Sequence, residues 1–419
     1  MSSGADAVTH ERDQTTVVVT GIGLAAPTGL DLDSHWQAVL AGKSAVSRIH
    51  RFDPATYPVR LAGQVPDFEA KTMVPRRLVP QTDHWTQLGL YAADLALTDS
   101  GVVTRERPEY EMAVVTSSSS GGTEFGQHEM ERLYQNGPSW VSAYQSIAWF
   151  YAATTGQVSI RHGLRGPCGV VCAEQAGGLD AIAQAVRLLR KSGVGLAITG
   201  GTDASLSPYG LTAQLSIGLL STVDDPASGY RPFDPSACGY FPGEGGALLV
   251  VERELDAVAR DAKRYGVIAG HAAGFQRPEQ PSVLASVIRR ALADAHLDAD
   301  DVDVVFADGM ANRADDQAEA RAIAEVFGPR GIPVTAPKTL TGRLYGGGAP
   351  LDVVTALLSL RDNVIPHTAG TETVAPDCPI DLVLDQPRER KLSTALVLAR
   401  GYGGFTSALV VSNTREGDR

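Results

Sequence analysis

The chain has 419 residues, of which 43% are hydrophobic and 20% are charged. These proportions are typical of a globular protein and exclude collagen, coiled coil or disorder over most of the length. The 36 Lys and Arg residues are outnumbered by 48 Asp and Glu residues, and this acidic balance without basic clusters argues against a nucleic-acid or anionic-membrane partner.

The chain ends and the thiols limit where the protein can reside. No apolar run approaches the ~18 residues of a membrane span, and residues 1–14 lack the apolar stretch of a signal peptide. We therefore expect a cytoplasmic protein with a disordered tail at 1–14 and a polar tail at 413–419. The four cysteines form neither a metal-binding pair nor a disulfide framework, so we expect no metal site. Cys168 and Cys172 lie in an apolar run, which predicts buried structural thiols.

Short β-branched runs alternate with helical patterns along the chain. The first part predicts strands at 17–20, 112–116, 195–199 and, as the start of a buried strand, 170–172, with helices at 34–40 and 176–191. The second part predicts strands at 267–269, 302–306, 395–399 and 408–411, with helices at 282–295, 315–327 and 350–360. This alternation predicts an α/β fold with a parallel or mixed sheet covered by helices. Because both parts share it, we expect duplicated halves at 15–262 and 263–412.

Two glycine-rich segments match nucleotide-binding motifs only formally. Residues 21–26 follow a strand and fit the dinucleotide fingerprint, but Pro27 and a polar stretch delay the next helix, whose N-cap is predicted at Asp33 or Ser34. We therefore predict a tight turn there. Residues 342–348 lack the Lys-Ser/Thr order of a phosphate loop, so a nucleotide site is not expected.

The strongest local feature is a strand–turn–helix over residues 170–191. Four apolar side chains fall on one face of its helix, namely Leu179, Ile182, Val186 and Leu189. Gln175 stands at the helix N-terminus, where backbone N–H groups and the helix dipole favour negative charge. A Gln is no nucleophile, although its amide can donate to a carbonyl or enolate oxygen. The alternative is that Gln175 only satisfies backbone groups at the helix end.

Several motifs in the right order resemble those of the β-ketoacyl synthases of the thiolase superfamily, over about residues 16–411. They are the opening strand and turn at 17–27, the run Arg231-Pro232-Phe233-Asp234 with Gly239 and Gly243-Glu244-Gly245-Gly246, and the late loop Gly401-Tyr402-Gly403-Gly404-Phe405. The resemblance implies an α/β fold of two duplicated halves stacked in five αβαβα layers.

The family's catalytic positions carry other side chains in this sequence. The alignment puts Gln175 where condensing members carry a nucleophilic Cys. Asp308 and Arg343 replace the two His residues, and Lys338 is retained. Without a thiolate the chain cannot form an acyl-enzyme, and without imidazoles it lacks the usual proton transfers. Condensation by this chain alone is therefore not expected, and whether it is itself an enzyme stays open.

Residues 171–178 closely resemble the elbow of the chain length factors, which are the ketosynthase beta subunits of bacterial aromatic (type II) polyketide synthases. This resemblance implies an obligate heterodimer with a Cys-bearing ketosynthase alpha subunit. It also implies a tunnel for the poly-β-ketone at the heterodimer interface. An acyl carrier protein would deliver the substrate on its phosphopantetheine, and no cofactor of the chain's own is implied.

Thr123, Gly126 and Met130 share one face of a predicted helix. The resemblance places a chain-length gate in this segment, where bulky aromatic side chains block the tunnel in the family. Small or flexible side chains at these positions imply a long product, of decaketide size or above. The alternative is that this face only packs closely against a neighbouring helix.

A local excess of aromatic residues follows the gate segment. In a chain that is 6% aromatic, twelve residues contain Trp140, Tyr144, Trp149, Phe150 and Tyr151. Large aromatic side chains dominate interface energetics, so we predict that this segment meets the partner subunit. The alternative is a buried core helix.

The degenerate site leaves two roles open for Gln175. It would mimic an acylated Cys and assist decarboxylation of malonyl-carrier protein, with the backbone N–H groups of Gln175 and Phe405 stabilising the enolate. Otherwise it only fills the space of the lost Cys. Asp308 and Arg343 could form an ion pair where the imidazoles would sit. For the whole chain, the alternatives are an independently active synthase homodimer and a purely structural scaffold.

Overall fold

The computed structural model describes residues 16–191, 193–277, 280 and 282–414. The tail expected at 1–14 lies outside these residues, as do residues 415–419 of the expected polar tail. No helix within the described ranges is long and apolar enough to cross a membrane.

Five strands of the first half lie side by side in the order β5-β4-β6-β7-β1. They are β1 (Val17–Ala25), β4 (Met112–Ser117), β5 (Cys168–Val171), β6 (Leu196–Ala204) and β7 (Glu244–Arg253). β4 runs parallel to both β5 and β6, whereas β7 runs antiparallel to β6 and to β1. β5, the third of these strands in chain order, therefore forms the free edge of this half.

The second half repeats this arrangement in the order β10-β9-β14-β15-β8. Its strands are β8 (Gly266–Phe275), β9 (Val304–Phe306), β10 (Pro333–Thr335), β14 (Thr394–Arg400) and β15 (Phe405–Ser412), with β12 (Asp381–Leu382) added beyond β10. The strand directions also match those of the first half. Two residue pairs between β1 and β8 join the halves into one sheet of 11 strands. The repeated order supports the predicted duplication, while its division at residues 262 and 263 stays a prediction.

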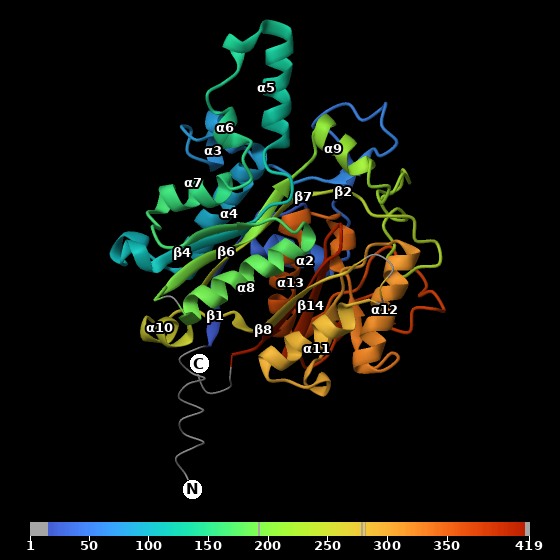
Figure 1. Cartoon of the computed structure of the whole chain (residues 1–419). Coiled ribbons are helices and arrows are strands. Elements are labelled where there is room, and N and C mark those ends of the chain that lie inside the picture. The colour runs from blue at the N-terminus through green and yellow to red at the C-terminus, as the bar shows by residue number, and fades with distance from the viewer. Residues whose placement is uncertain (1–15, 192, 278–279, 281, 415–419) are drawn as a thin grey trace.

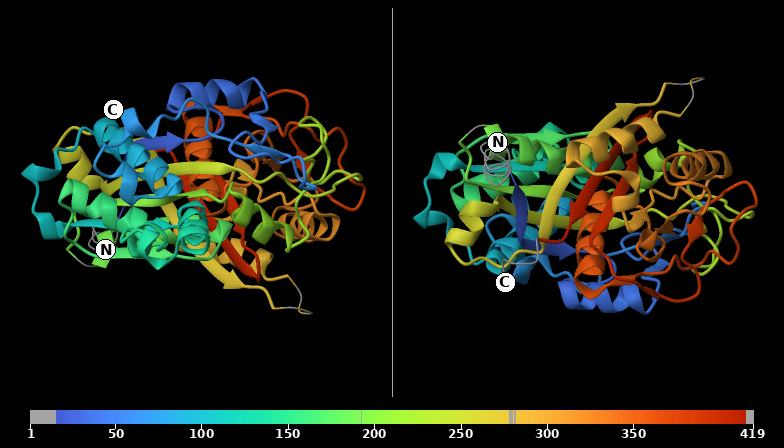
Figure 2. Two further views of the ribbon diagram at one scale, coloured as in Figure 1. Left: turned by 90° about the horizontal axis from the view of Figure 1, so that it is seen from above. Right: turned by 90° about the horizontal axis from the view of Figure 1, so that it is seen from below.

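Six helices complete the predicted five layers (Figure 1). In the middle, α8 (Gln175–Lys191) contacts strands of both halves, and α13 (Gly348–Asp362) beside it does the same. The first half is covered on its outer side by α4 (His84–Ser100) and α7 (Ala153–His162), and the second by α11 (Leu284–Ala295) and α12 (Arg313–Phe327). The α/β thiolase-like fold is therefore confirmed. Seen from above and from below, the two halves of the molecule lie side by side (Figure 2).

The apolar pattern of α8 explains its central place. The four side chains predicted to share one face, Leu179, Ile182, Val186 and Leu189, are all buried in the main core. α13 is buried along nearly its whole length, which is typical of a helix enclosed on all sides. These two helices fix the position of the candidate site, because its central turn leads into α8.

The tight turn predicted at residues 21–26 is wrong, because β1 continues through them to Ala25. A Cβ atom on Gly21 would lie 2.2 Å from the Ala96 carbonyl oxygen, and one on Gly23 would lie 2.0 Å from that of Ala92. The glycines therefore let α4 lie directly against the strand. Their function is close packing of backbones.

Two further predictions are corrected by the structure. α2 (Leu32–Leu40) begins earlier than expected, because Asp31 caps it and accepts a hydrogen bond from the Ser34 N–H. Cys168 and Cys172 are exposed, not buried, since β5 is the last strand of the sheet and leaves its outer side uncovered.

The remaining elements are β2 (Val46–Arg48), β3 (Leu61–Gly63), α3 (Ala70–Met73), α5 (Thr123–Asn136), α6 (Gln145–Ala148), α9 (Pro208–Leu215), α10 (Glu254–Ala259), β11 (Val364–Ile365) and β13 (Arg388–Glu389).

Candidate functional site

A sharp elbow joins the edge strand β5 to the central helix α8. Glu174 adopts a φ of 51°, in the left-handed region that a residue with a Cβ seldom occupies. This turn places Gln175 at the start of α8, where its side chain is completely buried. The position expected for a nucleophile is therefore held by an enclosed amide.

The Gln175 amide is buried without polar partners. Among the described residues, neither its Oε1 nor its Nε2 has a hydrogen-bond partner. The amide lies against the start of α13, where a Cβ on Gly348 would come within 2.6 Å of Oε1. A buried polar group without a partner carries a free-energy cost of about 1–3 kcal/mol. Gln175 is thus poorly explained as a group that only satisfies the helix end.

Asp308 and Arg343 form an ion pair at the positions of the family's two His residues. The Arg343 Nη2 lies 3.1 Å from Oδ1 and 3.3 Å from Oδ2 of Asp308, and both side chains are fully buried. Burial would raise the pKa of the Asp308 carboxyl, but Arg343, Lys338 and Arg400 together hold that pKa below its ordinary value. The pair is therefore charged at neutral pH, and a carboxylate whose pKa is lowered is a weak base.

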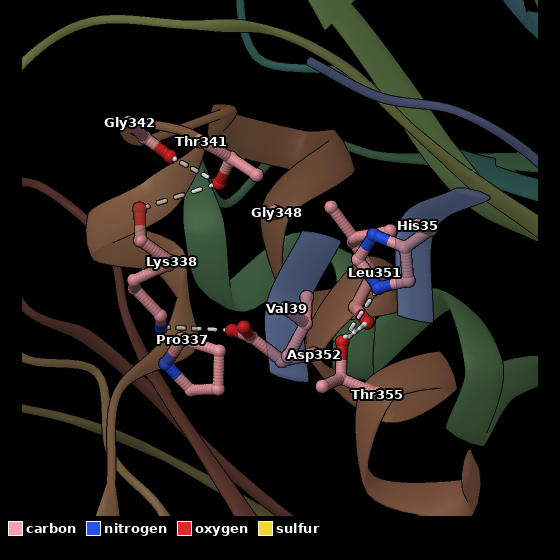
Figure 3. Close-up of a pocket in the computed structure, with 10 residues that line it drawn as sticks. All are labelled: His35, Val39, Pro337, Lys338, Thr341, Gly342, Gly348, Leu351, Asp352 and Thr355. Atoms are coloured by element: carbon pink, nitrogen blue, oxygen red, sulfur yellow. Dashed lines mark hydrogen bonds and ion pairs between the residues drawn. The ribbon is translucent and has the colours of Figure 1, made fainter. Parts of the chain in front are cut away.

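Further buried charges surround this pair. Arg400 lies 3.3 Å from Oδ2 of Asp308 and 2.8 Å from Oε2 of Glu319. Lys338 pairs with Asp352 of α13 at 2.8 Å between Nζ and Oδ2, and the two side chains point at one another across a small pocket (Figure 3). Each buried cation is matched by a carboxylate, so the former catalytic pocket is a closed set of ion pairs.

The glycine-rich loop at 401–404 packs directly on the elbow. A Cβ on Gly401 would lie 2.3 Å from the Ala173 carbonyl oxygen, and the Tyr402 N–H donates to Glu174 Oε2 at 2.7 Å. Phe405 starts β15, and its ring packs edge-to-face against Phe275 with 5.5 Å between centroids. The loop N–H group that reaches the elbow is therefore that of Tyr402, and a donor role for Phe405 stays a prediction.

The three gate residues lie on α5, which projects from the body of the molecule (Figure 1). Gly126 is buried, and a Cβ there would lie 2.9 Å from Cδ1 of Trp149. Thr123 is partly buried, and Met130 is 46% exposed. Gly126 therefore packs against an aromatic side chain, which links the gate segment to the aromatic segment that follows it.

The aromatic segment is exposed and does not form a core helix. Its five large side chains keep 40% to 62% of their surface exposed, namely Trp140, Tyr144, Trp149, Phe150 and Tyr151. The alternative of a buried core helix is therefore wrong for the single chain. Exposed large apolar side chains are typical of surfaces that another molecule covers, so the interface stays a prediction for this segment.

The strand β5 has an open edge with a groove beside it. Among the described strands, none pairs with the outer edge of β5. Beside it, Val170 and Val171 line a groove together with Asp180 and Arg187 of α8 and His271 of β8. Unpaired edges invite strand pairing with another chain. Within the described residues all four cysteines are free, and no cluster of His, Cys, Asp and Glu is placed to hold a metal ion.

Comparison with known proteins agrees with this geometry. The model of the β-ketoacyl synthase N-terminal domain matches residues 14–257, and that of the C-terminal domain matches residues 262–372. The tetracenomycin polyketide synthase ketoacyl synthase beta subunit of Streptomyces glaucescens is 57% identical over 94% of this chain and 98% of its own length. The chain belongs to the β-ketoacyl synthase family, in its branch of beta subunits, the chain length factors.

More distant relatives of this chain length factor include condensing enzymes by name. A 3-oxoacyl-[acyl-carrier-protein] synthase 2 of Coxiella burnetii is 32% identical over 94% of the chain and 98% of its own length. Among solved structures, a β-ketoacyl synthase from Burkholderia phymatum superposes with a TM-score of 0.89 at 27% identity, covering 96% of this chain and all of that one. The ishigamide ketosynthase/chain length factor has a TM-score of 0.88 at 24% identity, with the same coverage. The scaffold is thus shared with synthases.

The motifs located Gln175, Asp308 and Arg343, but they did not point to Glu174 or Tyr402. The hydrogen bond between these two joins residues 228 positions apart and uses a backbone N–H, which no residue pattern records. Two features of the sequence could have indicated this contact, namely an acidic residue at the elbow and a glycine-rich loop near the chain end. Both features stand in motifs shared with the chain length factors.

Proposed function

We propose that this chain length factor is the non-condensing subunit of a type II polyketide ketosynthase heterodimer. It would shape the acyl tunnel and set the length of the poly-β-ketone. The observation that carries the proposal is the buried Gln175 at the elbow, with the Asp308–Arg343 ion pair in place of the imidazoles. An amide cannot hold an acyl group as a thioester, and a carboxylate held ionised by an Arg is a weak general base, so we assign the chemistry to a partner.

The partner in this proposal is a ketosynthase alpha subunit with an intact nucleophilic Cys. The exposed aromatic segment and the open edge of β5 support it, because both are surfaces that a second subunit of the same fold can cover. The relative from Streptomyces glaucescens is itself named a beta subunit. A homodimer that condenses independently finds no support in the site, since Cys172 lies outside the elbow position.

An acyl carrier protein would supply the substrate of the heterodimer on its phosphopantetheine arm. One structure of the same fold is described as a type II polyketide synthase acyl-carrier protein in complex with its ketosynthase. We also infer a cytoplasmic location, because exposed free thiols such as Cys168 and Cys172 suit a reducing compartment.

Product length is assigned to the gate face of α5. Thr123 and Gly126 are small and Met130 is flexible, so a tunnel bounded by this face would be wide, and the proposed product is of decaketide size or longer. Thr123 is the better position for a test. A large side chain at Gly126 would also displace Trp149.

The test uses the Thr123→Phe variant in a synthase reconstituted with an alpha subunit and malonyl-loaded carrier protein. We expect products shorter by at least one ketide unit in mass spectrometry, because the ring would enter the tunnel. Gln135→Phe is the matched control, since Gln135 is exposed on the other side of α5. Full-length product from Thr123→Phe in an intact heterodimer would remove the gate and favour the purely structural scaffold.

A further inference from the structure

Three groups converge on the carboxylate of Glu174. Its Oε2 accepts a hydrogen bond from the Tyr402 N–H at 2.7 Å, and its Oε1 lies 3.6 Å from Nε of Arg343. Burial raises the pKa of the Glu174 carboxyl, while Arg343 and the backbone N–H groups of Tyr402 and Gln175 favour its ionised form. The carboxylate lies at the N-terminus of the 17-residue helix α8, where backbone N–H groups favour an anion.

The backbone of Glu174 is held in an unfavourable conformation at this position. A non-glycine residue at a φ of 51° costs free energy and persists only where the surrounding structure imposes it. Here the conformation directs the side chain back over the elbow toward Tyr402 and Arg343.

The unpartnered amide of Gln175 is a second, independent sign that this is a binding pocket for a polar group. Its Oε1 and Nε2 are completely buried and have no hydrogen-bond partner in the described chain. Of the two backbone N–H groups beside it, that of Tyr402 already donates to Glu174 Oε2 at 2.7 Å, and that of Gln175 favours the ionised form of the same carboxylate. A donor already bonded to a carboxylate is not available to an incoming oxygen.

We infer that Glu174 is an internal blocking carboxylate, which occupies the anion pocket at the elbow and keeps a malonyl thioester out of the Gln175 site. This inference rests on the proposed function and deepens it, because it assigns decarboxylation to the partner subunit. Glu174 acts here by occupying a position and touches no reacting atom.

The chemistry of decarboxylation shows why the block would be effective. The bond between the malonyl α-carbon and its carboxylate breaks, CO₂ leaves, and the electron pair passes to the thioester oxygen as an enolate, which then takes a proton. N–H donors at that oxygen lower the barrier. With Glu174 in place, the developing enolate meets a fixed negative charge and finds no free donor, so the step is disfavoured.

The test measures CO₂ release from malonyl-carrier protein by the complete heterodimer, with the catalytic residues of the alpha subunit disabled to lower the background. We expect Glu174→Ala to raise the rate at least tenfold over the unmodified chain, because the two N–H groups become free beside the Gln175 amide, which already lacks a partner. The added substitution Gln175→Ala should reduce that gain, since it removes the amide and keeps the backbone N–H groups. Glu174→Gln, whose amide oxygen still accepts from both N–H groups, should stay at the background rate.

Glu174→Asp offers a second variant if Glu174→Ala does not assemble, since the shorter side chain withdraws the carboxylate while keeping its charge, and it should give a smaller gain. Equal rates for Glu174→Ala and the unmodified chain, whether both fast or both at background, would overturn the inference. Assembly with the alpha subunit, and product length with an active alpha subunit, are measured in parallel on the unmodified chain. Failure of the unmodified chain in either measurement would count against the proposed function, which keeps the two failures distinct.

Discussion

At the level of single residues, the former catalytic pocket has exchanged reactive groups for charges that neutralise one another. Arg343 reaches Asp308 and, more distantly, Glu174, and Arg400 bridges Asp308 and Glu319. Replacing a buried ion pair as a whole often changes stability little, whereas removing one partner leaves an uncompensated charge. The network therefore makes each of its members sensitive to substitution although none of them performs a reaction.

Asp308→Asn should destabilise the protein by about 3–5 kcal/mol, because Arg343 and Arg400 would lose their shared carboxylate. Denaturant unfolding at pH 7 measures this. Glu325→Gln is the control, since its ion pair with Arg289 is more than half exposed on both sides and should contribute less than about 1 kcal/mol. A loss for Asp308→Asn no larger than that of the control would contradict the charged network.

The pH dependence follows from the lowered pKa of Asp308. A carboxyl whose pKa is lower in the folded state than in the unfolded chain stabilises the fold above the unfolded pKa. That stability is lost as the pH falls through the folded pKa. The stability difference between the native chain and Asp308→Asn should therefore shrink below about pH 4.

Motif spacing was enough to predict the pairing of Asp308 with Arg343, because each lies in a short segment with its own pattern. Contacts between distant segments were not accessible in this way. The exposure of Cys168 was mispredicted for the same reason, since an apolar run does not reveal that its strand ends the sheet.

At the level of elements, the α5 arm depends on one buried carboxylate. Asp83 caps α4 by accepting from the Trp85 N–H at 3.1 Å, and it accepts from the Phe125 N–H of α5 at 2.7 Å. Burial, followed by the nearby Glu124, raises the pKa of Asp83 to about 6. This group joins the gate helix to the body and titrates close to neutral pH.

The pKa of Asp83 is higher in the folded state than in the unfolded chain, so folding takes up a proton between about pH 4 and 6. The contribution of Asp83 to stability therefore falls as the pH rises through that window. Asp83→Asn should flatten the pH dependence of the unfolding free energy there by up to about 3 kcal/mol. Urea unfolding from pH 4 to 7 measures it. Asp300→Asn, at an exposed carboxyl, is the control and should leave the slope unchanged.

The open edge of β5 gives a second prediction at this scale. The Val114 N–H donates to the Pro167 carbonyl and the Ser118 N–H to that of Val171, so by the alternation of a parallel ladder Val170 directs its own N–H outward. Val170→Pro removes that donor and should weaken heterodimer formation at least tenfold in analytical ultracentrifugation, while leaving the β4 pairing intact. Val170→Thr keeps the N–H and should bind normally. Normal assembly of the proline variant would show that the edge is not part of the interface.

Element prediction succeeded where periodicity was strong and failed where packing overrode it. The helix over 176–191 was found because four apolar residues share one face. β1 was ended too early at its glycines, since the sequence does not show that α4 approaches them. The sequence analysis did not predict β7 or α4. The contacts that hold these two elements form only once the whole sheet has assembled.

At the level of the whole molecule, a duplicated α/β scaffold presents a degenerate site, a projecting arm and the free edge of β5. In the proposed function, the degenerate site accounts for a chain that would not condense alone. The arm and the edge explain how it can complete a partner's tunnel, since both lie at surfaces that the single chain leaves uncovered. The family identity and the fold support the same assignment.

Intact-protein mass spectrometry after incubation with acyl-loaded carrier protein tests the central claim most directly, because it reports which polypeptide holds the acyl group. With the heterodimer, we predict a mass increase on the alpha subunit and none on this chain. With this chain alone, we predict no acylation at any loading time. A stable acyl thioester on this chain in the absence of the alpha subunit would contradict the account.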